Sequence, residues 1–175
     1  MYLTQQSREA APPYTSQERL AANKRQARTI WAVGSSIVAI WVLAIILPTL
    51  LSPVRTFFGY LCHQISERSF HVAGEQMAVC SRCFGVYLGI LVGFALYPLF
   101  RNVENTEPPR RFWLLVAIIP AAVDWSLTVF GVWENTLWSR LVTGLILGGA
   151  CSVFIVPAVV EIVRNLTRER QANFR

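Results

Sequence analysis

The chain has 175 residues, of which 54% are hydrophobic and only 15% charged, with a formal net charge of +6 at pH 7. Most apolar residues fall in four blocks that are each long enough to cross a bilayer as a helix. This pattern excludes an ordinary water-soluble domain. It also excludes a membrane barrel, because barrels need short segments of alternating polarity. We therefore predict an all-α, polytopic membrane protein that forms a bundle of four transmembrane helices.

Residues 1–29 are polar and basic and are predicted to form an N-terminal arm in the cytoplasm. Within it, Thr15 and Glu18 have the spacing of a capping box, so a helix is expected to begin there and to continue into the first span, 30–51. A cleaved signal peptide is not expected, because the apolar stretch starts only at Ile30 and exceeds the length of a signal core.

The next segment, 52–78, is predicted to be a loop on the outer side of the membrane. Ser52 followed by Pro53 favours the start of a helix. Apolar residues recur at helical spacing from Val54 to Ile65, which predicts a short extracytoplasmic helix lying on the membrane surface. Cys62 belongs to its apolar side and is expected to face inward. Further along the loop, Gly74 predicts a turn.

Three more spans are predicted, at 79–100, 112–131 and 141–163, so that the membrane domain comprises 30–163. Two of these spans carry small residues at four-residue spacing: Gly85, Gly89 and Gly93 in the second, and Gly144, Gly148 and Ser152 in the fourth. Such ridges of small residues let two helices approach closely in lipid. We therefore expect the second and fourth spans to be in contact.

Most basic residues lie in the N-terminal arm, in the loop after the second span and in the tail, 164–175. The positive-inside rule then places both termini and this tail in the cytoplasm of a prokaryotic cell, in its inner membrane. The basic residues do not form a groove with interleaved aromatic residues, so no nucleic acid is expected as a partner. The expected partners are the lipid bilayer and other membrane subunits.

Three cysteines in and beside the outer loop form the main candidate site. Cys62, Cys80 and Cys83 could ligate a metal, most naturally zinc, because a two-residue gap between cysteines and a Cys3His set are both usual for this ion. Either His63 or His71 would be the fourth ligand. On a helix the side chains of Cys62 and His63 diverge by about 100°, which favours His71 unless the helix ends at Cys62.

Two other interpretations of the cysteines remain open. Cys80 and Cys83 form a CxxC motif at a helix N-terminus, where the helix dipole and nearby Arg82 lower a thiol pKa. With Cys62 they would serve a membrane thiol–disulfide oxidoreductase with quinone as cofactor, although the second cysteine pair usual in such enzymes is missing. Alternatively, the protein is a non-enzymatic subunit or scaffold of a membrane complex. A structural disulfide from Cys62 to Cys80 or Cys83, or a structural metal, would then join the surface helix to the bundle. Cys151 lies deep in the fourth span and is expected to fill space.

Several polar residues are expected near this site. The carboxylate of Asp124 in the third span is costly in lipid unless it is paired or hydrated. Two interpretations remain open: Asp124 lies in a polar cavity, or it forms a buried pair with Arg140 at the start of the fourth span that fixes the register of the helices. The polar neighbours of the cysteines are predicted to be Arg68, Arg82, Tyr87 and Arg140. The sequence leaves open whether the protein is an enzyme. If it is one, Glu67 or Asp124 is the candidate acid–base group, and Arg68 or Arg82 would clamp a phosphate or carboxylate.

The segments around the cysteines resemble the signature of a prokaryotic family of small predicted membrane proteins of unknown function. That signature reads C-H-Q-x-x-E-R-S-F, then C-x-R-C-x-G-x-Y-x-G, then an Asp in the third span and R-x-x-T-G at the start of the fourth. Here these elements begin at Cys62, Cys80, Asp124 and Arg140. Ser66 stands where the family usually has proline. The resemblance implies a set of site residues but no reaction.

Overall fold

The computed structural model describes residues 16–46 and 52–173. Within these ranges the chain forms five α-helices, one short 3-10 helix and two short strands: α1 (Ser16–Ile46), α2 (Ser52–Gly59), the 3-10 helix Ser66–Arg68, β1 (His71–Val72), β2 (Glu75–Gln76), α3 (Ser81–Phe100), α4 (Phe112–Val129) and α5 (Leu137–Asn173). The predicted all-α fold is confirmed.

Four of these helices, α1, α3, α4 and α5, are long and apolar enough to cross a membrane by length and composition. α1 runs from the polar N-terminal segment into the first apolar block without a break, as the sequence predicts. Thr15 of the expected capping box, and residues 47–51 at the end of the expected first span, lie outside the described residues. α5 is longer than the span expected within it, because it begins at Leu137 and reaches Asn173.

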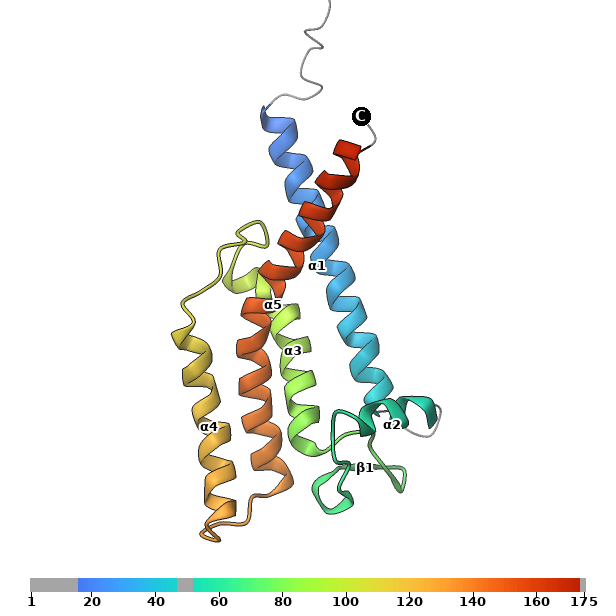
Figure 1. Cartoon of the computed structure of the whole chain (residues 1–175), viewed down its shortest axis with the longest axis vertical. Helices are drawn as coiled ribbons and strands as arrows, with labels where there is room; N and C mark the ends of the chain where they lie inside the picture. The colour runs from blue at the N-terminus through green and yellow to red at the C-terminus, as the bar shows by residue number, and fades with distance from the viewer. Residues whose placement is uncertain (1–15, 47–51, 174–175) are drawn as a thin grey trace, which may run out of the picture.

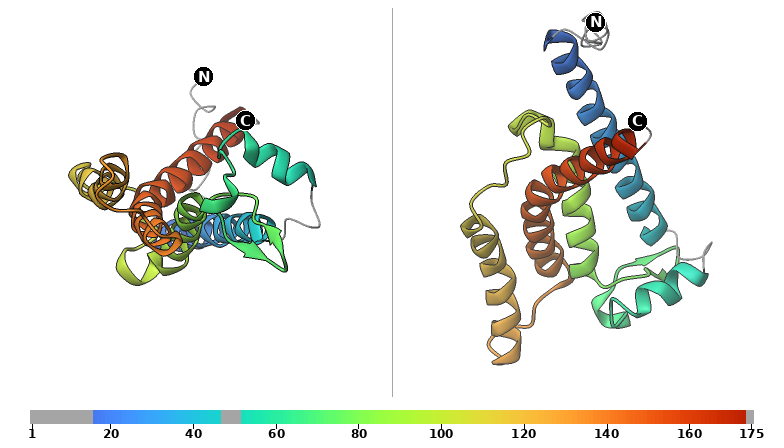
Figure 2. Two further views of the ribbon diagram at one scale, coloured as in Figure 1. Left: turned by 90° about the horizontal axis from the view of Figure 1, so that it is seen from below. Right: turned by 45° about the horizontal axis from the view of Figure 1, so that its top comes forward.

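α3 packs against both α5 and α1, and α4 lies on the other side of α5 (Figure 1). The start of α1 and the end of α5 lie at the same end of the bundle. The α2 helix and the strands lie at the opposite end (Figure 2). An even number of spanning helices produces this arrangement, because each span returns the chain to the opposite side.

The closest contact in the bundle joins α3 to α5. It is formed by the small residues predicted for it: Gly85, Gly89 and Gly93 on α3, and Gly144, Gly148 and Ser152 on α5. A Cβ atom at Gly89 would collide with the backbone of α5 at Leu145 and Gly149. Similarly, one at Gly144 would collide with the α3 backbone at Arg82. The predicted contact between the second and fourth spans is therefore confirmed.

Buried apolar side chains gather at the two ends of the bundle rather than along its whole length. One cluster joins α1, α3 and α5 and includes Ala27, Phe94 and Val156; there the Trp31 indole N–H donates a hydrogen bond of 2.7 Å to the carbonyl of Phe94. The other cluster lies under the outer loop and is described with the site. Most other large apolar side chains are exposed, as expected for helices whose outer faces contact lipid.

The predicted surface helix is shorter than its apolar pattern indicated. It was expected to continue to Ile65, but α2 ends at Gly59. The reason lies in the backbone: the Phe58 carbonyl accepts hydrogen bonds from both Leu61 and Cys62, at 3.0 and 2.8 Å, which closes the last turn. Phe58 anchors this helix, because its ring packs at a tilt against Trp41 of α1 and edge-on against Tyr87 of α3. Cys62 thus lies just beyond the helix.

A short β-hairpin, which the sequence did not predict, follows the 3-10 helix, and each of its two strands has two residues. His71 pairs with Gln76 and Val72 with Glu75 in an antiparallel register. The two turn residues, Ala73 and Gly74, have φ values of 52° and 86°. This left-handed pair forms the type I′ turn that suits a tight hairpin, and glycine adopts it without strain. The turn predicted at Gly74 is present, and it returns the chain toward α3.

The close contact between α3 and α5 makes a direct prediction about Gly89. Gly89→Leu should destabilise the protein by about 3 kcal/mol or more, because the new side chain must push the α5 backbone away. The measurement is the midpoint of thermal unfolding of detergent-solubilised protein.

The matched control is Ala95→Leu, since Ala95 lies on the same helix but is exposed. It should leave the midpoint nearly unchanged. Equal midpoints for the two variants would contradict the close packing of α3 against α5.

Candidate metal centre

The three cysteines predicted to act together do lie together. The Sγ atoms of Cys62, Cys80 and Cys83 are all within 4.8 Å of one another. Cys62 is buried, and the other two are half-buried. All three are free thiols in this structure. The backbone N–H of Cys80 donates a hydrogen bond of 3.2 Å to the Cys62 sulfur, which fixes the two chain segments against each other.

Cys80 and Cys83 owe their positions to the start of α3. Cys80 is the N-cap residue, with an extended backbone at φ −68° and ψ 161°, and its carbonyl accepts a hydrogen bond of 2.9 Å from the N–H of Phe84. Cys83 then lies in the first turn. Both cysteines therefore lie at the N-terminal turn of α3.

Cys62 is delivered by a loop that Gln64 holds in shape. Gln64 has a positive φ of 48°, unusual for a residue with a side chain. Its amide Nε2 donates to the carbonyls of Arg55 and Ala78, at 2.7 and 2.8 Å. Its own carbonyl accepts a bond of 2.6 Å from the side chain of Gln76 on β2. Gln64 thus ties α2, the hairpin and the approach to α3 together. Sequence reasoning noted it in the family signature but could not assign this role.

The apolar surroundings of the cysteines exclude water on one side. Cys62 belongs to a buried cluster with Ile45, Phe58, Met77, Ala78 and Val79. Hydrogen bonds from the thiol of Cys80, and next from that of Cys83, hold the pKa of the Cys62 thiol well below its ordinary value, although burial opposes this effect.

The two histidines occupy different places. His71 lies on β1, is exposed, and its Nε2 is 3.3 Å from the hydroxyl of Ser66. It does not line the cavity beside the cysteines. His63 does line that cavity, because α2 ends before Cys62 and the two residues are not held in a helix. Among the described residues, neither histidine joins the group of ligand atoms that all lie within 4.8 Å of one another.

A cavity of about 580 Å³ opens beside the cysteines, between the outer loop, α3, α4 and the start of α5. Its polar lining includes His63, Arg68, Arg82, Asn135 and Arg140. The three cysteines also line it, so any ion that they hold is accessible from this space. Glu67 is exposed on the 3-10 helix and does not line the cavity.

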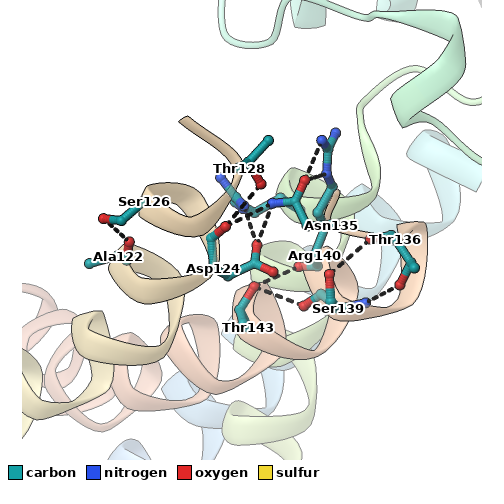
Figure 3. A network of polar contacts seen from close by, with 10 residues as sticks. Ala122, Asp124, Ser126, Thr128, Asn135, Thr136, Ser139, Arg140 and Thr143 are labelled. Atoms are coloured by element: carbon teal, nitrogen blue, oxygen red, sulfur yellow. Dashed lines mark hydrogen bonds and ion pairs between the residues drawn. The ribbon is translucent and has the colours of Figure 1, made fainter. Parts of the chain in front are cut away.

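Asp124 is the centre of a polar network at the cavity (Figure 3). It forms an ion pair with Arg82 of α3, with Oδ2 2.5 Å from Nη2. The same oxygen accepts a hydrogen bond of 2.8 Å from the amide of Asn135, which also donates to the Asp124 carbonyl. Arg140 donates to the Asn135 side-chain oxygen through Nε and Nη2, at 2.9 and 2.6 Å (Figure 3).

The predicted pair between Asp124 and Arg140 is therefore wrong. Asn135, in the loop between α4 and α5, stands between the two side chains and bonds to both. Arg82 takes the carboxylate instead, because the glycine contact holds the first turn of α3 against α5, next to α4. The sequence placed Asn135 near Arg140 but gave it no role, since the loop that carries it has no regular periodicity.

Two remaining predicted residues pack rather than line the cavity. Tyr87 is on the same side of α3 as Cys83, one turn further along, and contacts the apolar cluster through Phe58. Cys151 lies within α5, away from the other cysteines, and belongs to no group that could hold a metal among the described residues.

Comparison with known proteins agrees with the observed fold and the sequence resemblance. A family model described as a predicted membrane protein, DUF2085, matches residues 62–154, which include the cysteines, Asp124 and Arg140. The chain belongs to this family. It is 38% identical over 106 residues to an uncharacterised protein of Methanocaldococcus jannaschii, covering 61% of this chain and 68% of the relative. An uncharacterised protein of Methanothermobacter thermautotrophicus is 38% identical over 88 residues, covering 50% and 78%. No solved structure matches.

The network around Asp124 predicts a strong effect of removing its charge. Asp124→Asn should destabilise the protein by about 3–5 kcal/mol, because it leaves the half-buried guanidinium of Arg82 without a counter-charge. The midpoint of thermal unfolding in detergent measures the effect.

Glu107→Gln is the control, since Glu107 is exposed in the loop after α3. Combining Asp124→Asn with Arg82→Gln should cost less than the sum of the two single changes, as expected for paired groups. Strict additivity would mean that the pair does not act as a unit.

Proposed function

We propose that this integral membrane protein holds a zinc ion on Cys62, Cys80 and Cys83. The observation that carries the proposal is the mutual approach of the three sulfurs within 4.8 Å, as free thiols. Zinc–sulfur bonds of about 2.3 Å in tetrahedral geometry place sulfurs about 3.8 Å apart, so little movement would be needed to bind the ion.

The fourth coordination position would face the cavity. Three protein ligands and one open position are typical of zinc sites that act on a bound molecule, whereas structural sites are usually closed by four protein ligands. His63 is the better candidate to close the site, because it lines the cavity and His71 does not. The two possibilities predict different coordination: three sulfurs and one nitrogen, or three sulfurs and an exchangeable oxygen.

The charges around the cysteines support metal binding by thiolates. Arg82 lies between the two cysteines of the CxxC motif, and Arg140 lines the same cavity. The thiolate is the form of cysteine that binds metal, and positive side chains around the same cavity would offset the negative charge of three thiolates. The Asp124 carboxylate would hold Arg82 in place, which makes it a positioning residue rather than an acid–base group.

The cysteines and the cavity are proposed to lie on the outer face of a prokaryotic cell membrane, with both termini in the cytoplasm. This orientation is supported by the basic residues near the start of α1, after α3 and near the end of α5. The start of α1 and the end of α5 also lie at the end of the bundle opposite to α2 and the start of α3 (Figure 1).

Metal analysis tests the proposed centre. Protein purified in detergent without chelator should contain about one zinc ion per chain, and Cys80→Ser should lose most of it, because one of three thiolate ligands is removed. Elemental analysis by mass spectrometry measures the content.

Cys151→Ser provides the matched control, since this cysteine lies outside the cluster, and it should retain the zinc. Metal-free wild-type protein that also fails to take up added zinc would refute the metal centre.

Thiol–disulfide exchange is the second candidate, and the close approach of the free thiols of Cys62, Cys80 and Cys83 favours it. In that function Cys80 and Cys83 would form a disulfide and release two protons and two electrons. A membrane quinone would accept both and become a quinol.

Thiol trapping in intact cells separates the two functions. If the protein is a redox enzyme, Cys80 and Cys83 should be partly joined as a disulfide in growing cells. They should become fully reduced when the quinone pool is kept in its reduced, quinol form. If it is a zinc protein, both thiols should stay reduced and become reactive only after a chelator removes the ion, as mass shifts of alkylated protein will report.

A further inference from the structure

We propose that the cavity beside the cysteines binds a phosphate group, either that of an anionic lipid or free phosphate. The proposal deepens the function proposed for the same site. It rests on the zinc ion for one detail only, namely that a phosphate oxygen would take the open coordination position. The charge that attracts the anion comes from arginines and does not depend on the metal.

Three guanidinium groups line the cavity: those of Arg68, Arg82 and Arg140. Asp124, which pairs with Arg82, is the one carboxylate that forms an ion pair with any of them among residues 16–46 and 52–173. Arg140 bonds to the neutral amide oxygen of Asn135, and Arg68 is exposed and forms no ion pair within the same ranges. Both Arg68 and Arg82 are close enough to Arg140 for their charges to act on it.

The charges leave a surplus that an anion would neutralise. Three guanidiniums and one carboxylate give two net positive charges. A divalent ion on three thiolates adds one negative charge, so one positive charge remains when the metal is bound. Like charges held together near a membrane repel one another unless an anion joins them, and guanidinium groups match the oxygens of phosphate in geometry.

Arg82 also has a donor with no assigned partner. Its Nη2 binds Asp124, but its Nε atom is buried and makes no hydrogen bond within the described chain. A buried N–H without a partner is costly, so a ligand atom or an ordered water is expected to accept from it. Arg82 lines the cavity, so an oxygen of a bound phosphate is the partner that we propose for this donor.

The rim of the cavity favours a lipid as the source of the phosphate. It contains apolar side chains that are 40–58% exposed: Leu61, Ile65, Trp125 and Val129. An apolar rim around a basic centre suits a molecule with a charged head and acyl chains. A volume of about 580 Å³ is large enough for a headgroup, while the acyl chains would remain outside along α4.

The test is calorimetric titration of the purified, zinc-analysed protein in neutral detergent. The probes are inorganic phosphate, short-chain phosphatidylglycerol and phosphatidylcholine of the same chain length. Arg68→Gln and Arg140→Gln should each weaken binding of phosphatidylglycerol by about tenfold or more, the usual effect of losing a hydrogen bond to a charged group.

Arg140→Gln could lose binding by misfolding, because Arg140 holds Asn135. Arg68→Gln separates the two effects, because Arg68 is exposed and makes no contact that the fold requires. Arg110→Gln is the matched control, since Arg110 is exposed at the other end of α4. Arg110→Gln should bind phosphatidylglycerol as tightly as the wild-type protein does.

Arginine-dependent binding of phosphatidylglycerol alone supports the proposal with a lipid source, and arginine-dependent binding of inorganic phosphate supports it with a free anion. Equal binding by all variants, equally tight binding of phosphatidylcholine, or no binding of any probe overturns it. The zinc content of the same samples keeps the two proposals apart. Zinc-free protein with arginine-dependent binding refutes only the metal centre, whereas zinc-loaded protein without such binding refutes only the phosphate site.

Discussion

The backbone contact between α3 and α5 is the constraint on which the rest of the structure depends. Two glycine-bearing faces bring these helices so close that the carbonyl of Arg82 lies where a Cβ of Gly144 would be. The contact therefore reaches the same helical turn that carries the CxxC motif. In lipid there is little hydrophobic drive to bring helices together, so this close packing is what fixes the relative position of the site's elements.

The site follows from that position. The N-terminal turns of α3 and α5 lie side by side, and α4 and its following loop supply Asp124 and Asn135 to the space next to them. Arg82 faces Asp124 across this space, while the neighbouring cysteines face the apolar cluster under α2. One short motif thus contributes thiols to the candidate metal centre and a guanidinium to the polar network. A single turn of helix therefore carries both two candidate metal ligands and the arginine that pairs with Asp124.

Sequence reasoning predicted what depends on composition and helical periodicity: four apolar helices, the glycine contact, and the association of Cys80 with Cys83. It also grouped Cys62 with them, but through a helix that ends earlier than its apolar pattern indicated. The errors concern loops. Gln64 with its positive φ, the hairpin and Asn135 depend on hydrogen bonds between segments far apart in the chain, and no local pattern encodes such bonds. Asp124 was expected to pair with Arg140 but pairs with Arg82. This error also arises from contacts between distant segments, because Asn135 of the loop after α4 lies between Asp124 and Arg140.

The hydrogen bonds of Gln64 and Gln76 have a further consequence. Cys62 and Cys80 are 18 residues apart, so any link between them, through metal or sulfur, is a cross-link that encloses the hairpin. Closing a loop normally costs conformational entropy. Here the two glutamines already hold the enclosed segment in its final shape, so the cross-link would form on a pre-ordered loop. The side chains of Gln64 and Gln76 would thereby contribute to the affinity of the cysteines for the proposed ion by ordering the loop in advance.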